Sequence, residues 1–167
     1  MSNTQACLKR QMQQARQYTE ALLSDFKSLD QWLHQVHPQA NHALWFAGHM
    51  AVSDNFFISC IAPEKATKNA AFDEQFGMGS QPTSEPQKYQ PVDEVLAAMR
   101  ERRATLLGLL DGLNDDDLTK PPASGPSDFI PTIGSVFEMA VWHEGLHSGQ
   151  VSVARRAMGH KPVFGAS

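Results

Sequence analysis

The sequence predicts an all-α protein, a four-helix bundle with a long crossover loop between its second and third helices. Three observations support this. Four segments space their apolar residues at steps of three and four, the period of an amphipathic helix. Strand signals are nearly absent, because no Asn-Gly or Asp-Gly turn lies between alternating apolar and polar runs. Residues 62–90 are polar and contain Gly77, Gly79 and three prolines, so they suit the single long connection of such a bundle.

The first helical segment carries one apolar stripe and ends at His37-Pro38, because a residue before proline disfavours the helical conformation. Arg16 and the other charged residues of the segment fall off this stripe, as in an amphipathic surface helix. The stripe consists of Leu8, Met12, Ala15, Thr19, Leu22, Phe26, Leu29 and Leu33.

The second and third helices are predicted over about 39–61 and about 91–113. Pro63 ends the second, whose stripe is Trp45, His49, Val52, Phe56 and Cys60. Pro91 suits the first position of the third helix, and the two acidic residues after it suit the positive end of the helix dipole. The stripe of the third helix is Val92, Leu96, Met99, Leu106, Leu110 and Leu113.

The fourth helix is predicted to begin after Thr132, a suitable N-cap, and to run to about Met158 with Gly159 just beyond its end. Its inner face is expected to hold two histidines among small and apolar residues. That face consists of Val136, Ala140, His143, His147, Gln150 or Val151, and Ala154.

Length and composition limit the function classes. The 167 residues suit one domain, 1–167, and a net charge of −4 argues against nucleic-acid binding. Residues 31–53 carry no Asp, Glu, Lys or Arg, but their four histidines are too polar for a membrane span. No signal peptide is recognised at the N-terminus, and two cysteines cannot form a disulfide framework, so we expect a cytoplasmic protein.

The motif with chemical content is His-Glu-Gly-Leu-His, residues 143–147. Side chains at i and i+4 of a helix share one face, so His143 and His147 can reach one metal ion. His49 lies on the stripe of the second helix and can complete a three-histidine site. His42, one heptad earlier, remains a rival third ligand.

A metalloprotease is the minor alternative, with Glu144 as general base of an H-E-x-x-H motif. The longer protease motif requires a glycine and a third histidine where this chain has Gln150 and Val153. No acidic residue follows Glu144, and no sheet edge is predicted to hold an extended peptide.

The segments ALWFAGHMAVSDNFF and VWHEGLHSGQVSVARRAMG make the sequence similar to the DinB/YfiT-like superfamily. The resemblance implies a four-helix bundle, often homodimeric, that binds a divalent metal through one histidine of the second helix and two of the last. His49 matches the first of these, and His143, His147, Gly149 and Gln150 match the motif H-x-x-x-H-x-G-Q. Characterised branches include thiol-dependent S-transferases and a thiol-dependent isomerase, so the resemblance implies the metal more strongly than the substrate.

Four residues near the predicted ligands each have a possible functional role and a purely structural alternative. Glu144 is a general base, an acceptor for the N–H of His49, or a surface carboxylate. Gln150 hydrogen-bonds a ligand or is solvated, and Gly149 allows a helix or substrate to approach closely. Arg103 interrupts the stripe of its helix and is either an anion clamp or a snorkelling side chain.

We therefore expect a divalent-metal-dependent enzyme acting on a small molecule, most plausibly a thiol transferase or a hydrolase. Zinc, nickel or iron suits histidine ligands, and a low-molecular-weight thiol is a further candidate cofactor. The alternatives are a non-catalytic metal-binding dimer and an interaction dimer without metal. A homodimer is expected because several apolar residues lie off the stripes, namely Leu44, Phe46, Phe57, Phe137, Val141 and Trp142. Residues 62–90 are expected to lie near the open metal position.

Overall fold

The computed structural model describes residues 3–125 and 128–164, and the regular secondary structure of these residues is helical throughout. The prediction of an all-α protein is confirmed. The four long helices are α1 (Asn3–Leu23), α3 (Ala43–Ile61), α5 (Val92–Asp111) and α7 (Ile133–Ala157). The short elements are α2 (Leu29–Trp32), η1 (Pro63–Lys65), α4 (Ala70–Phe76), η2 (Pro86–Lys88) and α6 (Asp115–Leu118).

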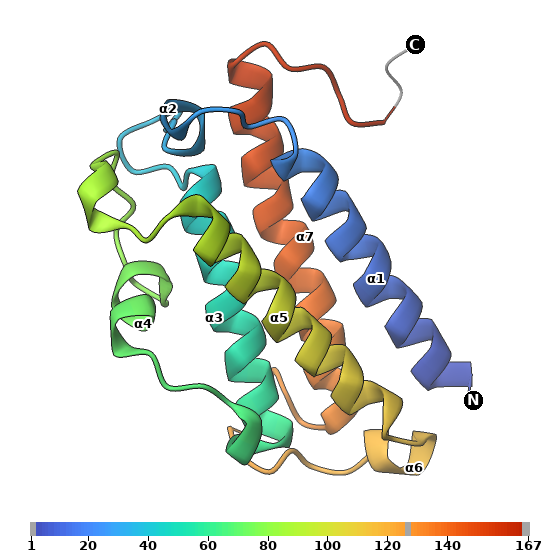
Figure 1. Ribbon diagram of the computed structural model, residues 1–167. Coiled ribbons are helices and arrows are strands. Elements are labelled where there is room, and N and C mark those ends of the chain that lie inside the picture. The colour runs from blue at the N-terminus through green and yellow to red at the C-terminus, as the bar shows by residue number, and fades with distance from the viewer. Residues whose placement is uncertain (1–2, 126–127, 165–167) are drawn as a thin grey trace.

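The four long helices pack side by side, as Figure 1 shows. α3 packs against α5 and α7, and α1 packs against α7 and less extensively against α5. α1 and α7 run in one direction, whereas α3 and α5 run in the opposite one (Figure 1). The residues between α3 and α5 therefore carry the chain back along the outside of the molecule, and α4 lies within this segment.

The first helix is shorter than its apolar stripe. α1 ends at Leu23, and α2 is a separate turn whose N-cap Ser28 accepts a hydrogen bond from the backbone N–H of Gln31. Phe26 turns back into the core between the two helices and packs against Trp32, with ring centroids 5.3 Å apart. The cap at Ser28 therefore begins a separate helix where the apolar periodicity alone would predict that the first helix continues.

Three of the other predicted helix ends differ from the structure, and the ends of α7 agree. α5 ends at Asp111 rather than near residue 113. α3 begins at Ala43 rather than near residue 39, because His42 caps it. Pro91 is the residue before α5 rather than its first helical residue. α7 begins after Thr132 in a capping box and ends before Gly159, which has a positive φ of 86°.

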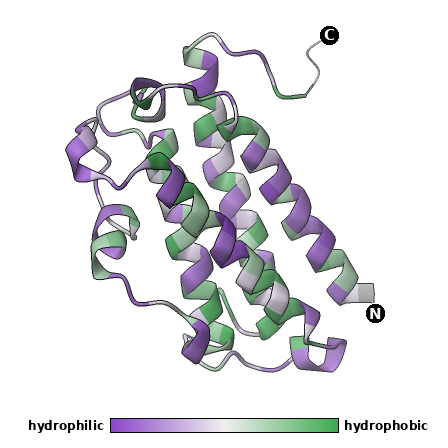
Figure 2. Cartoon of the chain, in the orientation of Figure 1, coloured by the Kyte–Doolittle hydropathy of each residue, from purple (hydrophilic) through white to green (hydrophobic). Residues whose placement is uncertain are grey.

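The core consists of two apolar clusters with a polar layer between them. The first cluster includes Leu22 and Met99, and the second includes Met12 and Leu106. Each long helix places a buried charged residue between its contributions to the two clusters, and the four that pair with one another are Arg16, Asp54, Arg103 and Glu144. Arg102 of α5 is also buried, but its acidic partner is Glu101. Figure 2 shows many hydrophobic residues along α3, whereas the outer surface of α1 is more hydrophilic.

Within the described residues, we find no helix that combines the length and the apolar character needed to cross a bilayer.

Candidate metal centre

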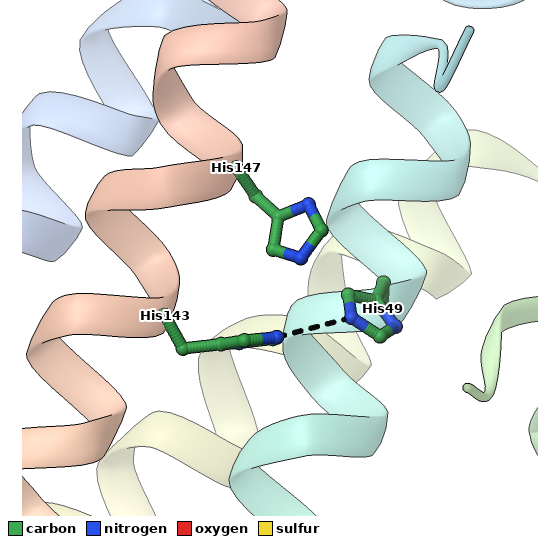
Figure 3. Close-up of side chains that lie close together, drawn as sticks. All are labelled: His49, His143 and His147. Carbon is green, nitrogen blue, oxygen red and sulfur yellow. Dashed lines mark hydrogen bonds between the residues drawn. The ribbon is translucent and has the colours of Figure 1, made fainter.

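Three histidine rings converge between α3 and α7 (Figure 3). His49 comes from α3, and His143 and His147 come from successive turns of α7. Their candidate ligand nitrogens all lie within 4.8 Å of one another, and the Nε2 atoms of His49 and His143 are 3.2 Å apart.

This arrangement fits a small divalent cation. Two imidazole nitrogens bound to tetrahedral zinc at about 2.0–2.1 Å lie about 3.3 Å from each other. The 3.2 Å between the Nε2 atoms of His49 and His143 has nearly this value. Three histidines without a fourth protein ligand are also the donor set of a site that keeps a position open for water or substrate. The residues present therefore fit the metal that the sequence implies.

Backbone and side-chain acceptors orient two of the rings. Nδ1 of His49 lies 2.7 Å from the carbonyl oxygen of Phe76, so it carries the proton and donates, which leaves Nε2 as the ligand atom. Nδ1 of His147 lies 2.9 Å from Oε1 of Gln150 and donates to it in the same way. The same oxygen accepts from Nδ2 of Asn41 at 3.0 Å, which fixes the orientation of the Gln150 amide. The Trp45 ring stacks on His49 with centroids 4.4 Å apart.

The environment keeps these imidazoles neutral. Burial, with a smaller contribution from the neighbouring His147 ring, lowers the pKa of His49 and of His143 to about 4. Burial also lowers the pKa of His147. A histidine binds a metal through its neutral form, so the site has its ligands in the required state at neutral pH.

His42 is not the third ligand. Its Nδ1 accepts the backbone N–H of Trp45 at 3.0 Å and thereby caps α3. Its Nε2 lies 3.1 Å from the carbonyl oxygen of Thr83 and 3.2 Å from the hydroxyl of Tyr89. Both ring nitrogens are therefore engaged away from the other histidines.

Glu144 and Arg103 do not face the three histidines, and the roles considered for them at the metal are wrong. Glu144 is fully buried, with its Oε1 atom 2.7 Å from Nε of Arg16 and its Oε2 atom 2.7 Å from Nη1 of Arg103. Arg103 also makes a bidentate contact with Asp54, with both N···O distances 2.9 Å. Glu144 is thus neither free to act as a general base nor the acceptor for His49, and Arg103 is already neutralised.

Gly149 and Gln150 lie on the exposed side of α7. A Cβ atom built on Gly149 would meet nothing within 4 Å, so no other helix of this chain approaches closely there. Gln150 contacts His147, as described above.

The three histidines line a cavity of about 780 Å³. Met78 and Gly79 line it, so part of the 62–90 segment lies beside the histidines as expected. The remaining walls come from α3, α7 and the residues just before α7. The lining residues are Trp45, His49, Val52, Ser53, Phe56, Phe57, Met78, Gly79, Phe129, Ile130, Met139, Trp142, His143 and His147.

The family model of the DinB superfamily matches residues 11–151, a range that contains all three histidines. The chain belongs to the DinB superfamily. No curated protein matches the chain.

Sequence reasoning missed two residues that support the site of this DinB-superfamily protein, Gly48 and Phe76. The Phe76 ring lies against the backbone of Gly48, where a Cβ atom would be only 2.3 Å from the ring. This close approach places the Phe76 carbonyl where it accepts from His49. The available signal was a glycine inside a helical pattern next to a candidate ligand, because such a glycine often marks close packing.

Replacing Gly48 with alanine should weaken zinc binding about 10- to 100-fold, the usual effect of losing a group that orients a ligand. The new methyl group displaces Phe76, and the His49 ring loses its acceptor. Competition with a chromophoric chelator measures the change. Gly108→Ala is the matched control, because Gly108 is also helical and a Cβ atom there meets nothing within 4 Å. Unchanged zinc affinity in a folded Gly48→Ala variant would show that Phe76 does not support the ligand.

Proposed function

We propose that this DinB-superfamily protein is a divalent-metal-dependent enzyme that acts on a small molecule, as a thiol S-transferase or a hydrolase. The observation that carries the proposal is the convergence of three neutral histidines in the wall of a ligand-sized cavity. A zinc, nickel or iron ion held there supplies Lewis acidity, which makes a water or a low-molecular-weight thiol nucleophilic at neutral pH.

Different residues of the chain hold the metal ion, orient its ligands and bind the substrate. His49, His143 and His147 hold the ion, and the Phe76 carbonyl and the Gln150 amide keep two of the rings in the required tautomer. The cavity binds the electrophile beside them. No Asp or Glu is among the described residues that line the cavity, so the proton released by the nucleophile passes to solvent rather than to a carboxylate.

Two alternatives fit the geometry less well. A purely structural zinc site almost always has four protein ligands, whereas the cluster among the described residues has three and opens into a cavity. A metalloprotease of the H-E-x-x-H type needs its glutamate free beside the metal, and Glu144 is engaged by two arginines.

The test begins with metal analysis of untagged protein, which should contain about one divalent ion per chain, as a site with three histidine ligands would. The double variant His143→Ala/His147→Ala should lose the ion, whereas the control His37→Ala, changed at an exposed histidine, should keep it. Each protein is then assayed for hydrolysis of neutral esters and for transfer of small thiols to an electrophile. Full occupancy in the double variant would refute the site. Metal-loaded protein without either activity would favour a non-catalytic role.

The proposal includes the architecture and the location. We take α1, α3, α5 and α7 as a four-helix bundle with the 62–90 segment as its crossover loop, within one domain over residues 1–167. Both cysteines, Cys7 and Cys60, are free thiols, which supports a cytoplasmic protein.

We also propose a homodimer, although of the residues that first suggested it only Trp142 belongs to the surface now proposed as the interface. Four of those residues, Leu44, Phe46, Phe57 and Phe137, are buried within the chain. The outer face of α7 instead exposes a stripe at steps of four and three, which consists of Glu138, Trp142, Leu146, Gly149, Val153 and Arg156.

This stripe is complementary to itself. Two copies of α7 packed antiparallel about residues 147–148 place Trp142 opposite the partner's Val153 and Leu146 opposite the partner's Gly149. The same register brings Glu138 near the partner's Arg156, so large residues face small ones and opposite charges meet.

Light scattering should therefore give twice the 18.4 kDa monomer mass at micromolar concentration. Leu146→Glu should give a monomer, because it places a charge in the middle of the stripe. Val36→Glu, at an exposed apolar residue outside the stripe, is the control. A monomeric wild-type protein would reject the dimer.

A further inference from the structure

We propose that the substrate is an uncharged molecule with an apolar body, which fills the cavity while its head group reaches the three histidines. This inference rests on the proposed function and specifies the substrate class. It separates the protein from enzymes that use anionic or zwitterionic thiols, because charged groups of those ligands that lie away from the metal would meet no oppositely charged lining residue.

The walls of the cavity are aromatic, aliphatic and thioether side chains from four parts of the chain. α3 contributes Phe56 and Phe57, among others, and α7 contributes Met139 and Trp142. Met78 comes from the 62–90 segment, and Phe129 and Ile130 precede α7. Burying one aromatic ring or alkyl chain against such walls contributes about 25 cal/mol for each Å² of apolar surface removed from water.

The charge of the cavity lining disfavours ionised ligands. None of the described lining residues is Asp, Glu, Lys or Arg, and the other polar side chain besides the histidines is Ser53. The arginines of the polar layer, Arg16 and Arg103, are paired with Asp54 and Glu144 and do not line the cavity. A carboxylate or phosphate on the body of the ligand, away from the three histidines, would lose its hydration without gaining an oppositely charged side chain, which is costly.

Size and shape favour a small molecule over a peptide. The volume of about 780 Å³ lies within the range of roughly 300–1,000 Å³ found for small-molecule sites. The three histidines form one polar cluster among apolar walls, so they orient a ligand that has one metal-binding end. Met78 and Met139 are unbranched and flexible, so they can adapt to bodies of different shape.

The first test uses cobalt-loaded protein, in which a bound thiolate gives a charge-transfer band. Three thiols are titrated: 2-phenylethanethiol, which has an uncharged apolar body, 2-mercaptoethanol, which has none, and 3-mercaptopropionate, which is anionic. We expect 2-phenylethanethiol to bind roughly tenfold or more tightly than 2-mercaptoethanol, the effect of burying an aromatic ring. 3-Mercaptopropionate should bind more weakly than both. Equal affinities, or tightest binding of the anionic thiol, would overturn the proposal.

The second test changes the walls without touching the histidines. Phe56→Ala and Met139→Ala should each reduce the affinity for 2-phenylethanethiol and leave that for 2-mercaptoethanol unchanged. Leu29→Ala is the matched control, because Leu29 is 45% exposed, close to the 49% of Phe56, and lies on α2 outside the cavity. If the control lowers the affinity as much as Phe56→Ala does, the cavity is not the binding site.

A third measurement separates this proposal from the proposed metal function. The uncharged fluorescent dye N-phenyl-1-naphthylamine is titrated into metal-free wild type and into His143→Ala/His147→Ala. Binding to both, weakened by Met139→Ala, supports an apolar cavity even if the protein fails to bind cobalt. Absence of dye binding, together with normal cobalt binding, would overturn the apolar cavity and leave the metal site intact.

Discussion

Replacing Arg103 with methionine should lower the free energy of unfolding by about 3–5 kcal/mol, the usual cost of removing one partner from a buried ion pair. Arg103 is almost fully buried and contacts both acidic residues of the polar layer, Asp54 and Glu144. Burial opposes the charge on its guanidinium, but these two carboxylates outweigh that effect and raise its pKa. Chemical denaturation followed by circular dichroism measures the loss.

The loss arises because the four buried charges neutralise one another as a set. Arg16 contacts the same two carboxylates as Arg103, at 3.0 Å to Asp54 and 2.7 Å to Glu144. Each of the four residues comes from a different long helix. Without Arg103, one positive charge faces two buried negative ones, and an unpaired buried charge is strongly unfavourable.

Arg100→Met is the control for this prediction. Arg100 lies one turn earlier on α5 and also makes a bidentate contact, at 2.9 and 2.7 Å, but its partner Glu20 and Arg100 itself are partly exposed. An exposed pair contributes about 0–1 kcal/mol, so this variant should be nearly as stable as the wild type. Arg103→Met/Asp54→Leu, which removes one charge of each sign, should recover part of the loss. Equal losses for the variants at 100 and 103 would contradict the importance of burial.

Saturating zinc should raise the free energy of unfolding by about 4 kcal/mol at a thousandfold excess over the dissociation constant. The reason is that the three ligands come together only in the folded chain, where α3 and α7 are packed. For a protein of this size the increment corresponds to roughly 8–16 °C in Tm. Thermal unfolding with and without a chelator at pH 7.5 measures it, and His143→Ala/His147→Ala should show no increment.

The pH dependence follows from the burial of the ligands. Because the pKa values of His49 and His143 are lowered to about 4, protons compete weakly with the metal in the folded state. We expect the zinc increment to persist at pH 5.5, instead of fading near the ordinary histidine pKa of about 6.5. Without metal, His49 and His143 bind protons between pH 6.5 and 4 in the unfolded chain but stay neutral in the folded chain. The free energy of unfolding of the metal-free protein therefore keeps the whole contribution of these two histidines above pH 6.5 and loses it as the pH falls from 6.5 towards 4.

A zinc increment that is largely lost at pH 5.5 would show that the ligands titrate like exposed imidazoles. A Tm unaffected by chelator at pH 7.5, in protein shown to contain zinc beforehand, would contradict the link between the metal and the fold.

Local patterns in the sequence were sufficient for the helices and for the candidate ligands. Apolar periodicity located α3, α5 and α7 to within a few residues, because a helix that packs on a core must present one apolar face. The i, i+4 spacing of His143 and His147 brought them to one face of α7 for the same geometric reason. The first helix was predicted too long, because apolar spacing does not show where a helix is interrupted. Ser28 caps a separate short helix there.

The tertiary structure decided which neighbours each polar residue has. Sequence alone left His42 and His49 as rivals, and the structure separates them because His42 caps α3 while His49 faces α7. Glu144 directly follows a ligand, yet a step of one residue turns its side chain about 100° around the helix axis, into the polar layer.

The polar layer is the feature that sequence could not predict. Each helix contributes a single charged residue, such as Arg16 on α1 or Asp54 on α3, and one such residue is indistinguishable from a solvated one. The burial of Arg16 becomes favourable only when the carboxylates of Asp54 and Glu144 and the carbonyl oxygen of Met99, each from a different helix, lie within hydrogen-bond distance. Periodicity is a property of one helix, whereas charge compensation is a property of all four packed together.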